Sequence, residues 1–273
     1  MGGGFGGALR EHLKLGLKAA ATRNAAHSLG DDLTRIETMG VVLGEECPPD
    51  HEPLLLTDFD PDFWRRLLDA AGLPWPERIA AAAQDHGFHP GGPGSNRRGR
   101  FRLWERLLLE SEGRPEALIF DAPPPEMTRL ADLQASMGGG PVADTGAAAV
   151  LGALFDDDLR SLSGERGVLV INVGNGHTVA FLVHRDRILG VYEHHTGMIE
   201  APVLWDHLQR FRAGILESEE VFDTGGHGCL RLDPPRSAGD FAPTFVLGPQ
   251  RDQLAPYGVS FPAPGGDMML AGC

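Results

Sequence analysis

Three apolar segments joined by two short turns constrain the fold more than any other feature of the chain. The segments cover residues 168–173, 178–183 and 188–192. Each is long enough and apolar enough to be a buried strand. Because turns this short join antiparallel neighbours, the three strands are expected to form an antiparallel meander.

The segments after this meander continue a recognisable order. We expect helices at 202–213 and 218–222, strands at 244–247 and 259–261, and the start of a helix at Met268. Three antiparallel strands, a helix, a fourth strand and a fifth strand are the order of the RNase H-like module of actin, heat-shock proteins and sugar kinases. The sequence therefore predicts an α/β protein whose second lobe, residues 138–273, is RNase H-like with a mixed five-stranded sheet.

Residues 1–137 read as a separate and incomplete α/β lobe. Its expected helices cover residues 8–20, 24–39, 60–71, 101–109 and 125–136, and its expected strands cover 41–43, 78–83 and 117–120. A glycine-rich loop at 1–7 precedes the first helix, and such a loop normally follows a strand. We therefore expect an upstream strand and glycine turn to be missing from this chain.

The strongest local motif is NVGNGHT at residues 172–178, in the turn between the first two strands of the meander. Gly174 and Gly176 let the backbone present N–H groups to an anion, with Asn175, His177 and the Thr178 hydroxyl close by. The motif matches the Asp-x-Gly-x-x-x-Thr phosphate loop of actin-like ATPases, with Asn172 in place of the aspartate. The alternative is a type I′ hairpin turn at Asn175-Gly176.

Two aspartates are the candidate catalytic residues. Asp85 lies in a QDHG segment at the end of an expected strand, where it could serve as a general base or a magnesium partner. An Asx turn before Gly87 would explain the same residues without chemistry. Asp144, followed by Thr145 and Gly146, opens a helix near a phosphate or metal, or is simply its N-cap.

Histidines and glycines downstream form a third group of candidates. Together with His86 and His177, the residues Glu193, His194, His195 and His227 could supply metal ligands. No pair has the i, i+4 spacing of a helical zinc site, and adjacent strand residues point to opposite faces, so the pattern disfavours a transition metal. Gly225, Gly226 and Gly248 are interpreted as backbone platforms for a base or ribose, or as plain turns.

Composition excludes several classes of function. The 24 basic and 38 acidic residues give a net charge of −14, which disfavours nucleic acid as a partner. One basic cluster, at residues 97–102 beside Asn96, could meet a small anion or form a solvated loop. The absence of a long apolar run argues against a membrane partner, and three scattered cysteines favour a reducing compartment, so we expect a cytoplasmic protein.

Many ordered motifs of this chain are shared with one family. They are the segments at residues 1–4, 31–33, 84–87, 95–97, 144–148, 172–178, 193–196, 220–223, 225–228 and 266–270. On these residues the chain resembles the uncharacterised family often labelled putative pyruvate formate-lyase activating enzyme, which is assigned to the actin-like ATPase superfamily. The resemblance implies a two-lobed architecture and an upstream Asp-x-Gly-x-Gly-Thr turn, which this chain lacks.

The label of that family conflicts with the cysteines. Activating enzymes of this kind hold an iron–sulfur cluster on a closely spaced cysteine run, whereas Cys47, Cys229 and Cys273 are far apart in sequence. We therefore expect no iron–sulfur cluster. The expected cofactor is ATP or another nucleotide with Mg²⁺, and the expected partner is a small molecule.

Three functions follow in order of preference. The first is a nucleotide- or phosphate-binding protein, a small-molecule kinase or phosphohydrolase, with the ligand between two lobes. The second is a noncatalytic nucleotide sensor or scaffold, favoured by Asn172 in place of aspartate, and the third is a metal-dependent hydrolase. Further residues expected to line the cleft are Gln84, His86, Asn96, Arg97, Glu193, His194, His195, His227 and Asp267.

Overall fold

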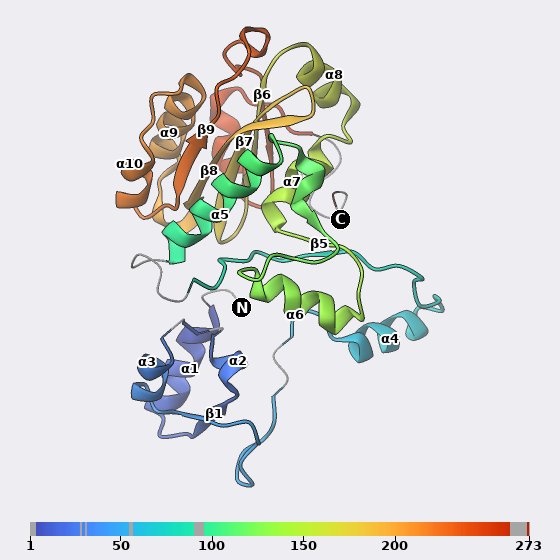
Figure 1. Ribbon diagram of the computed structural model, residues 1–273, viewed down its shortest axis with the longest axis vertical. Coiled ribbons are helices and arrows are strands. Elements are labelled where there is room, and N and C mark those ends of the chain that lie inside the picture. Colours follow the sequence, from blue (N-terminus) through green and yellow to red (C-terminus); the bar gives the residue numbers. More distant parts are fainter. Residues whose placement is uncertain are drawn as a thin grey trace.

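The computed structural model describes residues 4–27, 29, 30, 32–54, 57–89, 96–262 and 272. Within these residues the chain forms a mixed α/β structure with three separate sheets, the largest in the C-terminal half. Figure 1 shows the large sheet with its helices at one end, α4 and α6 in the middle, and the N-terminal helices at the other end.

The large sheet has five strands in the order β10-β6-β7-β8-β9. The meander is confirmed, because β6 (Val168–Val173), β7 (His177–His184) and β8 (Arg187–His195) pair antiparallel. Strand β10 (Thr244–Leu247) lies parallel to β6, on its other side. The fifth strand is β9 (Gly228–Arg231), antiparallel to β8, where the sequence indicated only a glycine-rich loop.

The predicted strand at 259–261 is wrong for these residues. Only Ser260 makes a bridge, to Phe245 of β10. Pro256 lies before this segment and Pro262 after it, and proline cannot donate a hydrogen bond to a sheet ladder. The edge beyond β10 is therefore left with a single bridge in place of a strand.

The pairing of β7 with β8 contains a β-bulge. Leu182 pairs with Gly190, but its neighbour Val183 pairs with Ile188, so Leu189 has no partner on β7. The extra residue shifts the register by one along the rest of the hairpin. As a result His177 at the start of β7 lies opposite His195 at the end of β8.

The β7–β8 turn holds two exposed residues in the left-handed region. Arg185 has φ 49° and Asp186 has φ 57°, as a type I′ turn requires, and non-glycine residues are strained there by about 1 kcal/mol each or more. We expect the double substitution Arg185→Asn, Asp186→Gly to raise the free energy of unfolding by about 1 kcal/mol. Chemical denaturation measures the change.

The control for this prediction is Asp233→Gly, at an exposed position that lacks a positive φ. Glycine there only adds freedom to the unfolded chain, so the control should lose stability. Equal effects of the two changes would show that the turn carries no strain.

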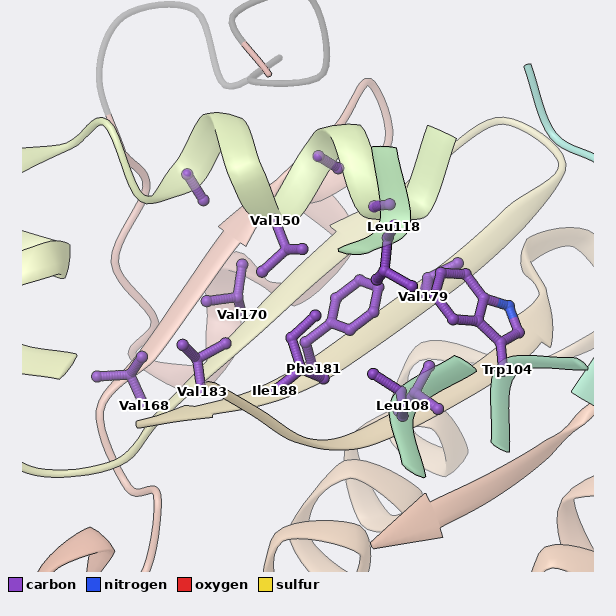
Figure 2. Close-up of a cluster of buried hydrophobic side chains, with 14 of the residues drawn as sticks. Trp104, Leu108, Leu118, Val150, Val168, Val170, Val179, Phe181, Val183 and Ile188 are labelled. Carbon is purple, nitrogen blue, oxygen red and sulfur yellow. The ribbon is translucent and has the colours of Figure 1, made fainter. Parts of the chain in front are cut away.

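Helices cover both faces of the large sheet. One face packs against α5 (Asn96–Glu110), α7 (Thr145–Ala153) and α8 (Asp157–Glu165), and the other against α9 (Ala201–Ala213) and α10 (Ser218–Asp223). Figure 2 shows Val150 of α7 directed toward Val170 of β6, and Trp104 of α5 near Phe181 of β7; the two ring centroids lie 5.9 Å apart. Burial on both faces explains the continuous apolar runs of β6–β8.

The middle of the molecule holds a small sheet. Strand β5 (Val142–Ala143) pairs in parallel with β3 (Ala81–Ala82) and antiparallel with β4 (Ile119–Phe120). Helix α6 (Thr128–Met137) packs against it through Leu130 and Leu133. The strands expected at 78–83 and 117–120 are therefore confirmed as shorter elements, the second preceded by the 3-10 turn η1 (Pro115–Leu118).

The N-terminal unit differs from the prediction in two ways. The expected helix at 8–20 is α1 (Gly4–Lys14) followed by β1 (Ala19–Ala21), and β1 pairs in parallel with β2 (Val41–Leu43). The expected helix at 24–39 is two helices, α2 (Arg23–His27) and α3 (Leu33–Thr38). The break has a physical cause, because the Asp32 side chain accepts hydrogen bonds from the N–H groups at the start of α3.

Local end signals are confirmed elsewhere. Helix α4 (Pro61–Ala70) begins with Asp60 as its N-cap and proline at its first position.

Helix α5 begins earlier than predicted, at Asn96, inside the loop expected at 89–99. Among the described residues, no helix combines the length and the apolar character needed to cross a membrane.

The expected division at residue 137 stays a prediction. The core on the α5 face of the large sheet draws residues from both sides of that boundary: Trp104, Leu108 and Leu118 pack with strand residues such as Phe181. Helix α5 therefore belongs to the core of the C-terminal sheet.

Candidate functional site

A buried arginine joins its own helix to three other segments near the C-terminal end of strand β8. Arg100 on α5 is 2% exposed, and its Nε donates to both carboxylate oxygens of Glu193 on β8, at 2.9 and 2.8 Å. Its Nη1 and Nη2 donate to Asp144 at 2.8 and 3.2 Å, and Nη1 also donates to the carbonyl oxygen of Asp85. The pair with Asp144 is bidentate, and the Nε N–H is shared between the two oxygens of Glu193, so the guanidinium fixes the positions of both carboxylates.

Arg100 and Glu193 each stay charged because an oppositely charged partner outweighs the effect of burial. Burial opposes the charged form of Arg100, but Asp144 and Glu193 outweigh it and raise its pKa. Burial likewise opposes ionised Glu193, but Arg100 outweighs that effect and lowers the pKa of the carboxyl. The network therefore holds two carboxylates against one guanidinium, an excess of one negative charge.

Neither candidate catalytic aspartate has a free carboxylate. Asp85 is buried and accepts hydrogen bonds from the N–H groups of Gly87 at 2.8 Å and Leu130 at 2.9 Å. This is the Asx turn that was the alternative explanation. Asp144 accepts from the Gly146 N–H at 2.9 Å as the N-cap of α7, besides pairing with Arg100. Both aspartates therefore organise the backbone around the site.

A cavity of about 750 Å³ lies between the small sheet and the turn that follows β6. One wall is formed by residues 79–84 and the aromatic side chains of Phe59 and Trp64, and Arg129 and Thr145 add polar groups. The opposite wall contains Asn172, Gly174, Asn175, Gly176 and His177 of the predicted phosphate motif. The motif therefore borders a cavity large enough for a small-molecule ligand.

The turn of the motif is not the type I′ hairpin turn proposed as its alternative. That turn requires positive φ at Asn175 and Gly176, and neither has it. In the part of the chain that the structure describes, the N–H groups of these two residues donate to no other group. A Cβ added to Gly176 would meet nothing within 4 Å.

Thr178, predicted to bind phosphate, lies outside the cavity lining. Its side chain is fully buried, and its hydroxyl lies 3.0 Å from that of Thr196. Thr196 in turn donates to the carbonyl oxygen of Gly174 at 2.8 Å. Because alternate strand residues face opposite sides of the sheet, Thr178 points away from the side that His177 faces. Its contact with Thr196 helps to hold the turn at Gly174.

Four histidines converge beside the ion-pair network, and we call them the histidine cluster. They are His86, His177, His195 and His227. One ring nitrogen from each lies within 4.8 Å of those of the other three. The sequence pattern disfavoured a transition metal because no pair has the i, i+4 spacing of a helical zinc site and because His194 and His195 point to opposite faces of a strand.

The ring nitrogens of the cluster differ in their hydrogen bonds. Nδ1 of His195 lies 2.7 Å from the carbonyl oxygen of Gly225. Both ring nitrogens of His177 and of His227 are buried without a hydrogen-bond partner. Burial lowers the pKa of His86 to about 3 and that of His177 to about 4, and it also lowers the pKa of His227. The rings of His86, His177 and His227 are therefore neutral near pH 7.

Gln84 and Arg129 connect the network to the cavity. Gln84 donates from Nε2 to Glu193 at 3.1 Å, and its carbonyl oxygen accepts from Arg129 at 2.8 Å. Both residues line the cavity, as His177 does for the histidine cluster. Ion pairs, cavity and cluster therefore form one continuous site.

Other predicted residues have structural partners. His194 faces away from the cluster, with its ring nitrogens 3.0 Å from the His195 carbonyl oxygen and 3.3 Å from the Thr224 hydroxyl. Arg97 donates to the carbonyl oxygens of Phe222 and Gly226. Both ring nitrogens of His194 therefore have protein partners, and the Arg97 guanidinium is held over the Phe222 ring of α10.

The predicted glycine platforms lie outside the cavity lining. A Cβ on Gly226 would lie 2.5 Å from the His194 ring, and a Cβ on Gly248 would lie 2.6 Å from Oδ1 of Asn172. Gly225 has φ 100° and supplies the carbonyl oxygen beside His195. Close packing and turn geometry therefore explain these glycines. Asp267 and the Asn96 side chain lie outside the described residues.

Sequence reasoning missed Arg100 as the centre of the site and treated it as part of an exposed basic cluster. The signal was present in the helical spacing, because Arg100 precedes Trp104 and Leu108 by four and eight residues. Residues at this spacing share one face of a helix. An arginine on the apolar stripe of a helix needs a buried acidic partner.

Comparison with known proteins assigns a family and no activity. The family model described as "Putative pyruvate format-lyase activating enzyme (DUF1786)" matches residues 1–253. None of the curated proteins matches the chain. Because the match spans most of the sequence, the chain belongs to this family, a domain family of unknown function.

Proposed function

We propose that the protein binds a phosphate-bearing small molecule, with a Mg²⁺-nucleotide as the first candidate, in the 750 Å³ cavity beside the turn after β6. The observation that carries the proposal is the turn itself, whose Asn175 and Gly176 N–H groups are unpaired at the cavity wall. Unpaired backbone N–H groups in a tight turn are a common way to hold phosphate oxygens.

The rest of the cavity suits the same ligand. Thr145 starts α7, and the N-terminus of a helix favours an anion. Arg129 supplies a positive charge, although it also pairs with Asp58. Trp64 on the far wall offers an aromatic face against which a base could stack.

The topology also supports a place in the actin-like ATPase superfamily. An antiparallel meander followed by a strand parallel to the first, β10 beside β6, is the arrangement expected for its RNase H-like module. In that module the turn after the first strand binds phosphate. The ligand would lie between the small sheet and the large one, the two-lobed arrangement expected from the resemblance.

The arrangement favours binding over turnover. Asn172 stands where a carboxylate would hold a magnesium-bound water, and the carboxylates of Asp85 and Asp144 are held by backbone N–H groups and Arg100. We therefore favour a noncatalytic nucleotide sensor or scaffold over a small-molecule kinase or phosphohydrolase.

Calorimetry with Mg-ATP, Mg-ADP and inorganic phosphate tests this proposal. Gly176→Glu places a negative charge at the turn without a steric clash, and we expect it to weaken nucleotide binding at least tenfold, or about 1.4 kcal/mol. The matched control is Gly164→Glu on α8, where a Cβ also meets nothing within 4 Å. The control should bind as the parent protein does.

A phosphate-release assay separates the two forms of the proposal. Binding without release of phosphate from ATP fits a sensor, whereas release would identify a phosphohydrolase. If none of the three ligands binds, or if both glutamate variants lose binding equally, the cavity is not a phosphate site.

A further inference from the structure

We propose that the histidine cluster binds one divalent transition-metal ion, with Zn²⁺ as the test ion. The proposal goes beyond nucleotide binding and does not depend on it. It rests on the convergence of four imidazoles, on their unpaired nitrogens, and on the groups that surround them.

The four rings approach one another as a ligand set would. Their ring centroids lie 4.4 Å apart for His177 and His195, 4.8 Å for His195 and His227, and 5.1 Å for His177 and His227. His86 completes the group, at 5.1 Å from His177 and 5.5 Å from His227. A tetrahedral zinc site with Zn–N distances of about 2.0–2.1 Å places its nitrogens roughly 3.4 Å apart.

The observed nitrogens lie within 4.8 Å of one another. Metal binding would therefore shorten the distance between any two of them by roughly 1.4 Å at most. Side-chain rotation can supply such a change. Two of the residues are already fixed relative to each other, because His177 and His195 are directly paired across β7 and β8 and face the same side of the sheet.

The unpaired nitrogens distinguish the cluster from ordinary buried histidines. His184 lies in the same sheet and has partners on both ring nitrogens, the Ser163 carbonyl oxygen at 3.1 Å and the Ser237 hydroxyl at 3.0 Å. His177 and His227 have none, although the ring nitrogens of both are buried and His227 is only 2% exposed. A buried polar atom without a partner costs about 1–3 kcal/mol, and a bound metal ion would remove that cost.

Groups around the cluster would orient its ligands. The Gly225 carbonyl oxygen can only accept a hydrogen bond, so it selects the tautomer of His195 with the proton on Nδ1, which leaves Nε2 as the nitrogen that can bind a metal. Nδ1 of His227 lies 3.9 Å from Oε2 of Glu193, near enough for a small approach to form a carboxylate–histidine pair. In the neighbouring ion-pair network, the Glu193 carboxylate favours an added cation and the Arg100 guanidinium opposes it.

The ligand type selects the metal class. Neutral imidazole suits Zn²⁺, Co²⁺, Ni²⁺, Cu²⁺ and Fe²⁺, whereas Mg²⁺ and Ca²⁺ prefer oxygen ligands. Since His177 also lines the cavity, a bound ion would lie at the border of the proposed ligand pocket. The Mg²⁺ that accompanies a nucleotide would occupy a different site.

Metal titration of the full chain tests the proposal. The protein is first treated with a chelator, and Zn²⁺ is then titrated without nucleotide. We expect one Zn²⁺ per chain and a rise in Tm on binding. With Co²⁺ in place of Zn²⁺, we expect the visible absorption typical of four-coordinate cobalt.

Substitutions identify the ligands. We expect His177→Ala and His227→Gln each to weaken zinc binding at least tenfold, whereas the control His207→Gln should bind zinc normally. His207 is buried in the same half of the molecule, with its Nδ1 3.2 Å from the Tyr192 hydroxyl. If His227→Gln does not fold, His86→Ala on the loop after β3 gives the same test.

Two results would overturn the proposal. One is zinc binding that survives unchanged in His177→Ala and His86→Ala, which would place the ion elsewhere. The other is a chelator-treated protein that takes up neither Zn²⁺ nor Co²⁺. Either result leaves the nucleotide proposal standing, because nucleotide binding is measured separately with Mg²⁺.

Discussion

Replacing Arg100 with methionine is expected to lower the free energy of unfolding by about 3–5 kcal/mol. Methionine fills a similar volume but leaves the carboxylates of Asp144 and Glu193 buried without their cation. Removal of one partner from a buried ion pair is costly because the remaining charge has lost both water and counter-charge. Denaturant unfolding monitored by circular dichroism measures the loss.

The matched control is Arg98→Met, two residues earlier on the same helix. Arg98 pairs with Glu219 at the surface, where both side chains contact water, and exposed pairs contribute little. We expect no measurable change in stability. Arg100→Lys should fall between the two, because lysine restores the charge but lacks the planar set of donors that reaches both carboxylates. A loss below about 1 kcal/mol in Arg100→Met would show that the network is not a stabilising centre.

The metal-free protein is expected to lose stability steeply as the pH falls below about 6.5. The folded-state pKa values of His86 and His177, about 3 and about 4, lie below the ordinary value of 6.5. Between these values the unfolded chain binds protons that the folded chain excludes, so acid favours unfolding. Each group contributes up to about 1.4 kcal/mol per pH unit, and His227 adds an effect of the same sign.

The surrounding charges do not reverse this sign. Arg100 also lowers the pKa of His86, and Glu193 opposes it, but burial is the largest cause. Burial raises the pKa of Asp85, so this group favours the folded state as the pH falls, at pH values near and above its ordinary 3.8. Several buried histidines therefore oppose one buried carboxyl, and loss of stability in acid is the expected net effect.

Unfolding curves across this pH range, recorded with a chelator present, measure the effect. The variant His86→Gln, His177→Gln should show a weaker dependence on pH, and the exposed His12→Gln on α1 should behave as the parent. A free energy of unfolding that stays constant from pH 6.5 to about pH 5 would contradict the prediction.

The large sheet was predictable because several signals agree. The strands β6–β8 are apolar on both faces and joined by short turns, so strand type, order and direction follow from the pattern. Strand β9 was missed because Gly228–Arg231 contains a glycine and an arginine and is held mainly by its neighbour β8. Strand β1 consists of three alanines, which have little intrinsic preference for a strand.

The site was predictable only in its parts. The motif at 172–178, the histidines and both aspartates were named from sequence, but which of them meet depends on tertiary packing. The Asp85 carboxylate meets the Leu130 N–H across 45 residues, and Arg100 reaches Glu193 across 93. Separations of this size carry no local signal, so the roles of Asp85 and Asp144 as structural partners were visible only in the folded chain.

The unpaired Leu189 in β8 has a consequence beyond the shape of the strand. If the ladder ran on from the turn without a bulge, Leu189 would pair with Leu182, His177 would face His194, and His195 would point to the opposite side of the sheet. One surplus residue therefore selects which of two neighbouring imidazoles joins His86 and His227. A relative whose hairpin has the same length but no bulge would keep both histidines in its sequence and still lose the fourth ligand.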